Sequence, residues 1–212
     1  EFQIPIDFRF KNGTKIENRS VQLTKLSEDF YFALPWKPEI ARIDPEYGLL
    51  AKIDFKKPRD MLFAQLEDES DMIGRIWAIE ALQKKGDKKT VEALAKRLNE
   101  DPFWGVRIEA AKGLNEIHSE EAREALLASQ VQPDDRARQA VARAIGGFYH
   151  ESVPDALIHR LSEEENPMIA ANLIRSLAPY SNSETQQTLL RELNSDGFRQ
   201  FRSNAAISAM KA

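Results

Sequence analysis

The sequence predicts an α+β, mostly α protein: an N-terminal antiparallel β-sandwich, or part of one, in residues 1–57, followed by an α-solenoid of about five helix pairs in residues 58–212. Two patterns predict this architecture. Apolar and polar side chains alternate near the N-terminus, which is typical of strands. When the rest of the chain is compared with itself, five positions come into register at successive offsets of 32, 31, 32 and 32 residues, a period typical of stacked helical repeats: Arg75, Arg107, Arg138, Ala170 and Arg202.

The head begins with alternation over residues 2–10, where Phe and Ile occupy one side of a predicted half-buried strand. Asn12-Gly13 follows, a dipeptide that tolerates the positive φ angles of a tight hairpin turn. Two further strands are predicted over residues 30–34 and 40–43. This part of the chain therefore reads as four or so short antiparallel strands.

Such a sheet needs a cover, because a small sheet with one wet face is marginally stable by itself. We therefore expect a β-sandwich, either complete or cut part-way through. Pro5 cannot donate a ladder hydrogen bond, so its strand is predicted to lie at an edge or to carry a bulge there. The chain opens with Glu1 inside a predicted strand, and we expect it to be a piece of a longer protein.

The predicted helices share a core pattern and recognisable ends. Asp101-Pro102 reads as an N-cap followed by proline at the first helical position, and Asn166-Pro167 repeats it. Seven residues after each aligned position, the second helix of every pair carries an apolar residue that is predicted to be buried: Leu82, Leu114, Ile145, Leu177 and Ala209.

This pattern resembles HEAT repeats, particularly the short kind found in phycobilin-lyase-like proteins. The resemblance implies that an acidic turn residue six positions before the arginine helps to link adjacent repeats. Gln132 departs from that pattern before Arg138, and the fourth repeat lacks the arginine, which interrupts the implied ladder. We interpret the row as structural rather than as a binding site; its matching pairs are Asp101 with Arg107, Asp196 with Arg202 and, loosely, Glu69 with Arg75.

Composition excludes several classes of function. The formal net charge is −4, and basic and acidic residues are interleaved, so no clustered positive field for nucleic acid is predicted. No apolar run approaches the ~18 residues that would suggest a membrane span. We expect a soluble protein, with the cytoplasm favoured over the periplasm or secretion. The absence of cysteine excludes disulfides and thiolate ligands.

No catalytic or metal-ligating residue is predicted in this chain. His150-Glu151 resembles the start of a zinc-peptidase helix, but the second histidine would have to stand four residues on, where the sequence has Pro154. His118 and His159 have no histidine partner at helical spacing either. No cofactor is therefore expected within the chain itself.

Aromatic residues near the predicted turns are the candidates for contacting a peptide or protein partner. Phe148-Tyr149 falls in a predicted loop, and Trp104 lies at the start of a predicted second helix. Packing in the solenoid core is the alternative reading for such residues, because aromatic rings fill helical cores well.

The order of the two halves carries a second resemblance. Residues 2–6, 30–38 and 43–45, followed by helical repeats, resemble the C-terminal part of the aminopeptidase N family of zinc metallopeptidases. The resemblance implies a parent enzyme that holds zinc in an upstream catalytic domain. Residues 58–212 would cover the active site of that domain and shape the access of peptides to it. Its partners would be that domain and the peptide substrate. None of the zinc ligands lies in this chain, so this part is expected to be non-catalytic.

Two alternatives stay open at this point. One is a catalytically dead relative of that family that serves protein assembly. The other is a free-standing HEAT-repeat adaptor whose strands form their own domain. The reading frame upstream of Glu1 would separate all three: an intact His-Glu-x-x-His motif indicates the active parent, a degraded motif the dead relative, and a start codon immediately before Glu1 the adaptor.

Overall fold

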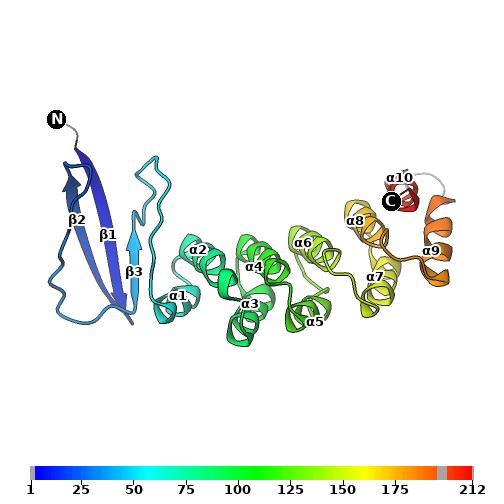
Figure 1. The fold of residues 1–212 in the computed structure, drawn as a ribbon, viewed down its shortest axis with the longest axis horizontal. Helices are drawn as coiled ribbons and strands as arrows, with labels where there is room; N and C mark the ends of the chain where they lie inside the picture. The colour runs from blue at the N-terminus through cyan, green and yellow to red at the C-terminus, as the bar shows by residue number, and fades with distance from the viewer. Residues whose placement is uncertain (1–2, 195–199, 212) are drawn as a thin grey trace. The chain divides into compact units, whose positions relative to one another are not determined.

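A computed structural model describes residues 3–194 and 200–211 (Figure 1). The chain divides into two compact units, Glu1–Ala81 and Leu82–Ala212. The first unit holds the strands and the first helix pair, and the second holds the remaining helices. The predicted boundary after residue 57 coincides with the change from strands to helices. That residues 1–57 and 58–212 are separate domains stays a prediction.

Three antiparallel strands form one sheet with the order β2-β1-β3 in the described residues. A tight turn joins the first two, and Gly13 in that turn has a φ of 55°, as the Asn-Gly dipeptide predicts. Pro5 lies in the central strand, but β3 pairs only with residues 8–11, so no third strand among the described residues lies beside the proline. The strand bounds are Ile4–Asn12 for β1, Lys15–Leu23 for β2 and Ile40–Ile43 for β3.

The predicted strand over residues 30–34 is wrong, since this segment has no ladder partner and is irregular. Its alternation reflects packing instead. The ring of Phe32 lies 4.9 Å from that of Phe8 and 5.3 Å from that of Phe10, so it covers one face of the sheet as an extended loop. The described residues accordingly show a single small sheet covered partly by a loop, where a β-sandwich was predicted.

The sheet and the first helix pair are tied together within the first unit. Buried Arg42 of β3 donates from Nε to Asp71 Oδ2 at 2.6 Å, and its guanidinium lies 4.5 Å from the ring centre of Trp77. Helix α1 also packs against β3. The helices of this pair are α1, Arg59–Leu66, and α2, Met72–Leu82.

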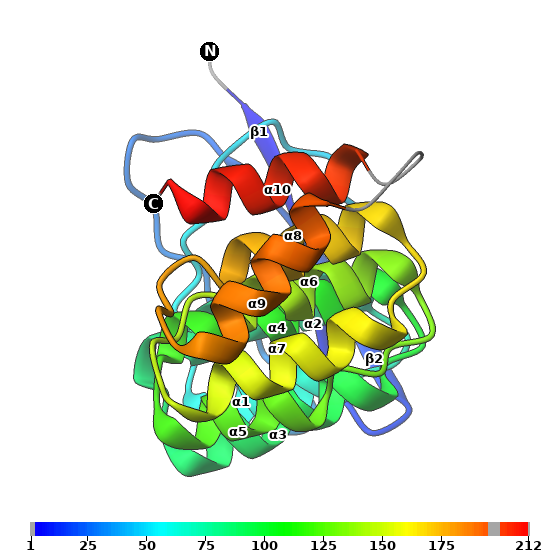
Figure 2. The same cartoon turned by 90° about the vertical axis from the view of Figure 1, so that its right-hand side faces the viewer.

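The second unit contains a short 3-10 turn and eight α-helices in its described residues, in chain order four helix pairs. The second helices α4, α6, α8 and α10 pack side by side in one layer, and α3, α5, α7 and α9 lie in the other (Figures 1 and 2). Continuity of the first pair with these four stays a prediction. The bounds are η1 Gln83–Lys85, α3 Lys88–Glu100, α4 Trp104–Ile117, α5 Glu120–Ala128, α6 Asp135–Ile145, α7 Ser152–Glu163, α8 Pro167–Ser176, α9 Ser183–Leu193 and α10 Gln200–Met210.

The apolar positions predicted from the period are buried between these layers. All five residues seven after the aligned positions are 5% exposed or less, and Leu114 and Ile145 are completely buried. In the third repeat, Ala122 and Leu126 supply the buried apolar contacts of α5. The 32-residue period therefore located the core correctly.

One predicted helix start is confirmed and one is wrong. Asn166 caps α8, because its Oδ1 accepts hydrogen bonds from the backbone amides of Met168 and Ile169. Helix α4 starts at Trp104, two residues later than the predicted proline position, and Asp101 instead closes α3. The carboxylate of Asp101 is needed in the turn itself, where Oδ1 accepts from the Phe103 amide at 2.9 Å.

Candidate binding surface on the second helices

The aligned arginines donate to backbone carbonyls of the preceding turn. Arg107 Nε lies 2.6 Å from the carbonyl oxygen of Asp101, and Arg138 Nη1 lies 2.8 Å from that of Gln132. In the first unit, Arg75 Nη1 reaches the carbonyl of Asp68 at 2.8 Å. The implied pairing of Glu69 with Arg75 is not the contact that forms. In these three repeats a hydrogen bond to the main chain holds the turn.

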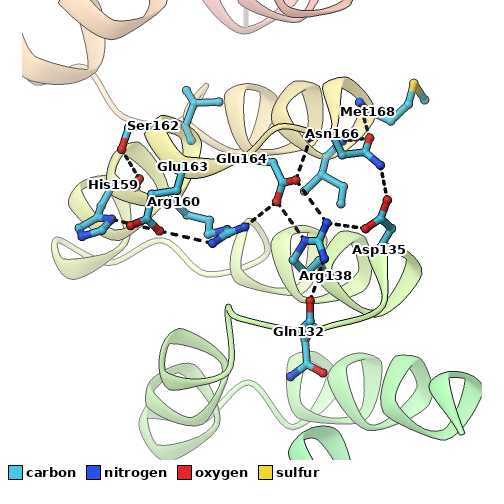
Figure 3. A network of polar contacts seen from close by, with 12 residues as sticks. Gln132, Asp135, Arg138, His159, Arg160, Ser162, Glu163, Glu164, Asn166 and Met168 are labelled. Carbon is cyan, nitrogen blue, oxygen red and sulfur yellow. Dashed lines mark hydrogen bonds and ion pairs between the residues drawn. The ribbon is translucent and has the colours of Figure 1, made fainter.

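The same arginines also link one repeat to the next, as the resemblance to HEAT repeats implied. Arg107 Nη1 lies 3.3 Å from Gln132 Oε1. Figure 3 shows the next link, in which Arg138 Nε lies 3.2 Å from Glu164 Oε2. Gln132 and Glu164 occupy equivalent turn positions, six residues before the aligned positions 138 and 170. We call this set the arginine ladder: Arg107, Gln132, Arg138 and Glu164.

Glu164 is the buried carboxylate of the ladder. Burial alone would raise its pKa, but hydrogen bonds from Arg160, the Asn166 amide and Arg138 outweigh burial, and the pKa is lowered. Arg160 Nη2 lies 2.9 Å from Glu164 Oε2 (Figure 3). Glu164 is therefore a buried, fully engaged carboxylate, unlike a general acid, which needs a raised pKa.

The two ends of the predicted ladder differ from its middle. Ala170 has no group that could reach the fifth repeat, as the sequence indicated. Arg202 instead pairs with Glu192, whose Oε2 lies 2.6 Å from Nε. Asp196, its predicted partner, lies outside the described residues. The ladder shown by the structure thus spans the second to fourth repeats.

Of the predicted contact aromatics, Phe148 is buried and Tyr149 is exposed. The Phe148 ring is 6% exposed and stacks on His118 of the preceding repeat, with ring centres 4.4 Å apart. The prediction that Phe148 is an exposed contact is therefore wrong. Tyr149 is 77% exposed and stacks on Tyr180, at 5.3 Å between ring centres. Tyr149 remains available for a partner.

Trp104, the third predicted contact, lines a groove between α4 and α6. The groove has a volume of about 390 Å³. The Arg136 guanidinium lies 3.6 Å from the ring centre of Trp104, and Asp134 holds that guanidinium through Oδ2 at 2.7 Å from Nη2. The remaining lining side chains are of mixed character: Ile108, Lys112, Asn115, Glu116, Gln139, Ala140, Arg143 and Ala144.

Sequence reasoning missed three basic side chains that share one repeat position. Lys112, Arg143 and Arg175 lie five residues after the aligned positions of the second, third and fourth repeats. All three are exposed on the neighbouring helices α4, α6 and α8. The same self-comparison that aligned the arginines of the ladder would have found them, had every position of the repeat been examined and not the apolar ones alone.

Within the described part of the chain, no cluster of three or more metal-binding side chains is present. None of its described helices has the length and apolar character needed to cross a lipid bilayer.

The helix pairs, their period and the linking arginines agree with the comparison to known families. The family profile of HEAT repeats matches residues 59–146 and 127–211, together more than two thirds of the chain. The chain belongs to the HEAT repeat family. No curated protein matches the sequence. The HEAT repeats comprise all the elements from α1 to α10.

Proposed function

We propose that this HEAT-repeat chain is a non-catalytic scaffold that binds a segment of a partner protein along its second helices. The observation that carries the proposal is the groove between α4 and α6, where the half-buried Trp104 is accessible from solvent. Tryptophan and arginine in central pockets contribute most of the binding energy at many protein interfaces. Repeat arrays also commonly bind extended partners along one layer of helices.

The chemistry of the polar network supports binding over catalysis. The ladder carboxylate Glu164 is buried and paired with two arginines, and its lowered pKa keeps it charged at neutral pH. Arg138 reaches it from the third repeat, and Arg160 holds it within the fourth. The network therefore holds the solenoid rigid, which helps to keep the second helices in one fixed row for a partner.

The test uses two matched variants that fill different grooves. Ala140→Trp fills the groove beside Trp104, and Ala156→Trp fills a groove of about 420 Å³ between α5 and α7 on the first-helix layer. Peptides are first selected from a random library on the purified chain. We expect Ala140→Trp to weaken binding of these peptides about tenfold or more and Ala156→Trp to leave it unchanged.

Two outcomes would contradict the proposal. Failure to select any peptide would argue against binding of linear segments. Loss of binding only in Ala156→Trp would move the site to the first helices. Thermal unfolding of both variants provides the control, because a folding defect would lower the unfolding temperature together with the binding.

A second proposal keeps the resemblance of residues 2–6, 30–38 and 43–45 to zinc aminopeptidases. We propose that, in such a parent enzyme, residues 58–212 would cover the active site of an upstream domain that holds zinc. What supports it is the order of a small antiparallel sheet followed directly by helix pairs. Sequencing upstream of Glu1 in the source gene tests it: an intact His-Glu-x-x-His motif would support the enzyme, and a start codon or a broken motif would overturn it.

A further inference from the structure

The exposed basic row on the second helices consists of Lys112, Arg143 and Arg175, which we call the basic stripe. Each residue comes from a different repeat, and each repeat packs its second helix against the next. Because the three residues share one repeat position, the stripe runs across α4, α6 and α8 rather than along one helix. It borders the groove of Trp104, since Lys112 and Arg143 both line that groove.

The guanidinium groups of the stripe have no polar partner among the residues that the structure describes. Among residues 3–194 and 200–211, neither Arg143 nor Arg175 makes an ion pair or a side-chain hydrogen bond. Lys112 Nζ lies 3.0 Å from Glu109 Oε2, in a pair whose lysine side chain is 61% exposed. A surface pair of this kind contributes little and exchanges readily with other ions. The stripe is therefore available to an anionic partner.

Stabilisation of helix ends does not account for the whole stripe. Arg143 and Arg175 lie in the last turns of α6 and α8, where a cation interacts favourably with the helix dipole. Lys112, however, lies a full turn before the end of α4, outside that range. A role that involves all three side chains requires a binding partner long enough to contact α4, α6 and α8.

Nearby acids do not cancel the stripe toward its C-terminal side. Helix α8 contains no acidic residue, and the acids near α6 are engaged: Asp134 binds Arg136, and Asp135 binds Arg138 and Asn166. Glu116 is the remaining acid that lines the Trp104 groove. The field along Arg143 and Arg175 is thus positive even though the whole chain carries a net charge of −4.

We propose that the basic stripe binds an extended acidic segment of a partner protein, with carboxylates at about every third residue. The inference rests on the proposed function and names the partner's chemistry. Packed helix axes lie about 8–10 Å apart, and an extended chain advances about 3.1–3.4 Å per residue. Three residues of such a segment therefore match one repeat. An apolar side chain of the same segment would enter the groove beside Trp104.

Three cations in a row are too few for nucleic acid. A duplex-binding surface neutralises several phosphates at once, and on this surface Glu109 and Glu116 lie beside the stripe. A peptide with separated carboxylates avoids these acids, whereas a continuous phosphate backbone meets them. The acidic peptide is thus the occupant that the charge pattern favours.

The test compares labelled peptides of equal composition by fluorescence anisotropy. One carries glutamate at every third residue, a second has the same glutamates in one block, and a third has glutamine in their place. We expect the spaced peptide to bind most tightly and to weaken as salt rises from about 50 to 500 mM, because exposed ion pairs are screened. Equal binding of the spaced and blocked peptides would overturn the predicted spacing.

Two triple variants with the same charge change serve as matched chains. Lys112→Gln with Arg143→Gln and Arg175→Gln removes the stripe. Lys88→Gln with Lys96→Gln and Arg191→Gln removes three exposed cations from the first helices α3 and α9. We expect the stripe variant to bind the spaced peptide about tenfold more weakly, as the loss of three exposed pairs implies, and the control variant to bind it normally. Equal effects would overturn the stripe as the site.

Competition experiments separate other anions from the acidic peptide. Tighter binding of single-stranded DNA or of anionic phosphatidylserine vesicles than of the spaced peptide would overturn the assignment. Failure of the stripe can be told apart from failure of the scaffold. Library peptides that bind the Trp104 groove equally well in the unchanged protein and in the stripe variant would refute the stripe alone. Insensitivity of all peptides to Ala140→Trp would instead refute the proposed function.

Discussion

Two rows of basic side chains run across the same layer of helices, and they differ in the contacts that their side chains make. The arginines of the ladder, Arg107 and Arg138, lie at the aligned position, where each bonds to the turn before it and to the next repeat. The basic stripe lies five residues later and faces solvent. A repeated charge therefore does not by itself reveal a role. What separates the rows is whether the polar atoms already have partners inside the protein.

The largest loss of stability is expected for a substitution in the apolar core, and the effects of substitutions in the two rows are compared with it. Leu114 is completely buried in α4. Leu114→Ala should lower the free energy of unfolding by about 2–5 kcal/mol, since it removes buried methyl groups and leaves a cavity. Urea denaturation followed by circular dichroism measures this loss. A near-neutral result would mean that α4 does not use this side chain in the core.

The ladder should respond strongly to loss of one arginine. Arg138→Gln leaves the buried Glu164 with one arginine fewer, and we expect a loss of about 3 kcal/mol of unfolding free energy. Arg143→Gln, five residues along the same helix, is the matched control and should change stability by less than about 0.5 kcal/mol. Equal losses in the two variants would abolish the distinction between the rows.

Glu164→Gln is expected to cost less stability than Arg138→Gln, because glutamine already occupies the equivalent turn position of the third repeat, Gln132. The folded-state pKa of Glu164 is lowered by its arginine and amide hydrogen bonds in spite of burial, so the charged form stabilises the fold. We expect a loss of about 1 kcal/mol at pH 7. The stability difference from the unchanged protein should be complete above about pH 5 and shrink as the pH falls below about 4.

Urea titrations of both proteins between these pH values provide the measurement. A difference that stays constant on acidification would show that the charge of Glu164 does not contribute. A difference that grows on acidification would contradict the direction assigned to the pKa.

The smallest effect is expected for the stripe in the absence of a partner. The stripe variant Lys112→Gln with Arg143→Gln and Arg175→Gln should change the free energy of unfolding by only about 0.5 kcal/mol, because it loses exposed charges and two weak helix-end interactions. Calorimetry at low and high salt measures it. A loss of several kcal/mol would assign the stripe to the fold rather than to a partner.

The periodic part of the fold was predictable from the sequence, and the isolated contacts were not. Buried positions such as Leu114 and Ile145 follow from the 32-residue period, since each repeat offers the same pattern to its neighbours. Residues 30–34 were misassigned, because alternation specifies which side chains face inward but does not supply a partner strand. Phe32 satisfied that alternation by packing on Phe8 and Phe10.

The candidate site was predicted only in part, for a related reason. Trp104 and Tyr149 are accessible, as predicted, but Phe148 is covered by His118, thirty residues earlier in the chain. Such a long-range contact leaves no local signal. The arginines at positions 107 and 138 were predicted from sequence as structural, but their partners Gln132 and Glu164 were not; the acceptor in the turn, a main-chain carbonyl, is present at every residue and so is invisible in any pattern of side chains.

That choice of acceptor makes the hydrogen bond to the turn independent of which side chain stands there. Since Arg107 and Arg138 bind carbonyl oxygens, the residues at positions 101 and 132 can differ without releasing the arginine. Related sequences can therefore diverge at these turns while that hydrogen bond persists, although the link from Arg107 to the next repeat needs the side chain of Gln132. For engineering, it means that a library randomised at the buried position 132 should keep the bond from Arg138 to the main chain in every folded member, and that its yield should depend on whether the new side chain can accept from Arg107.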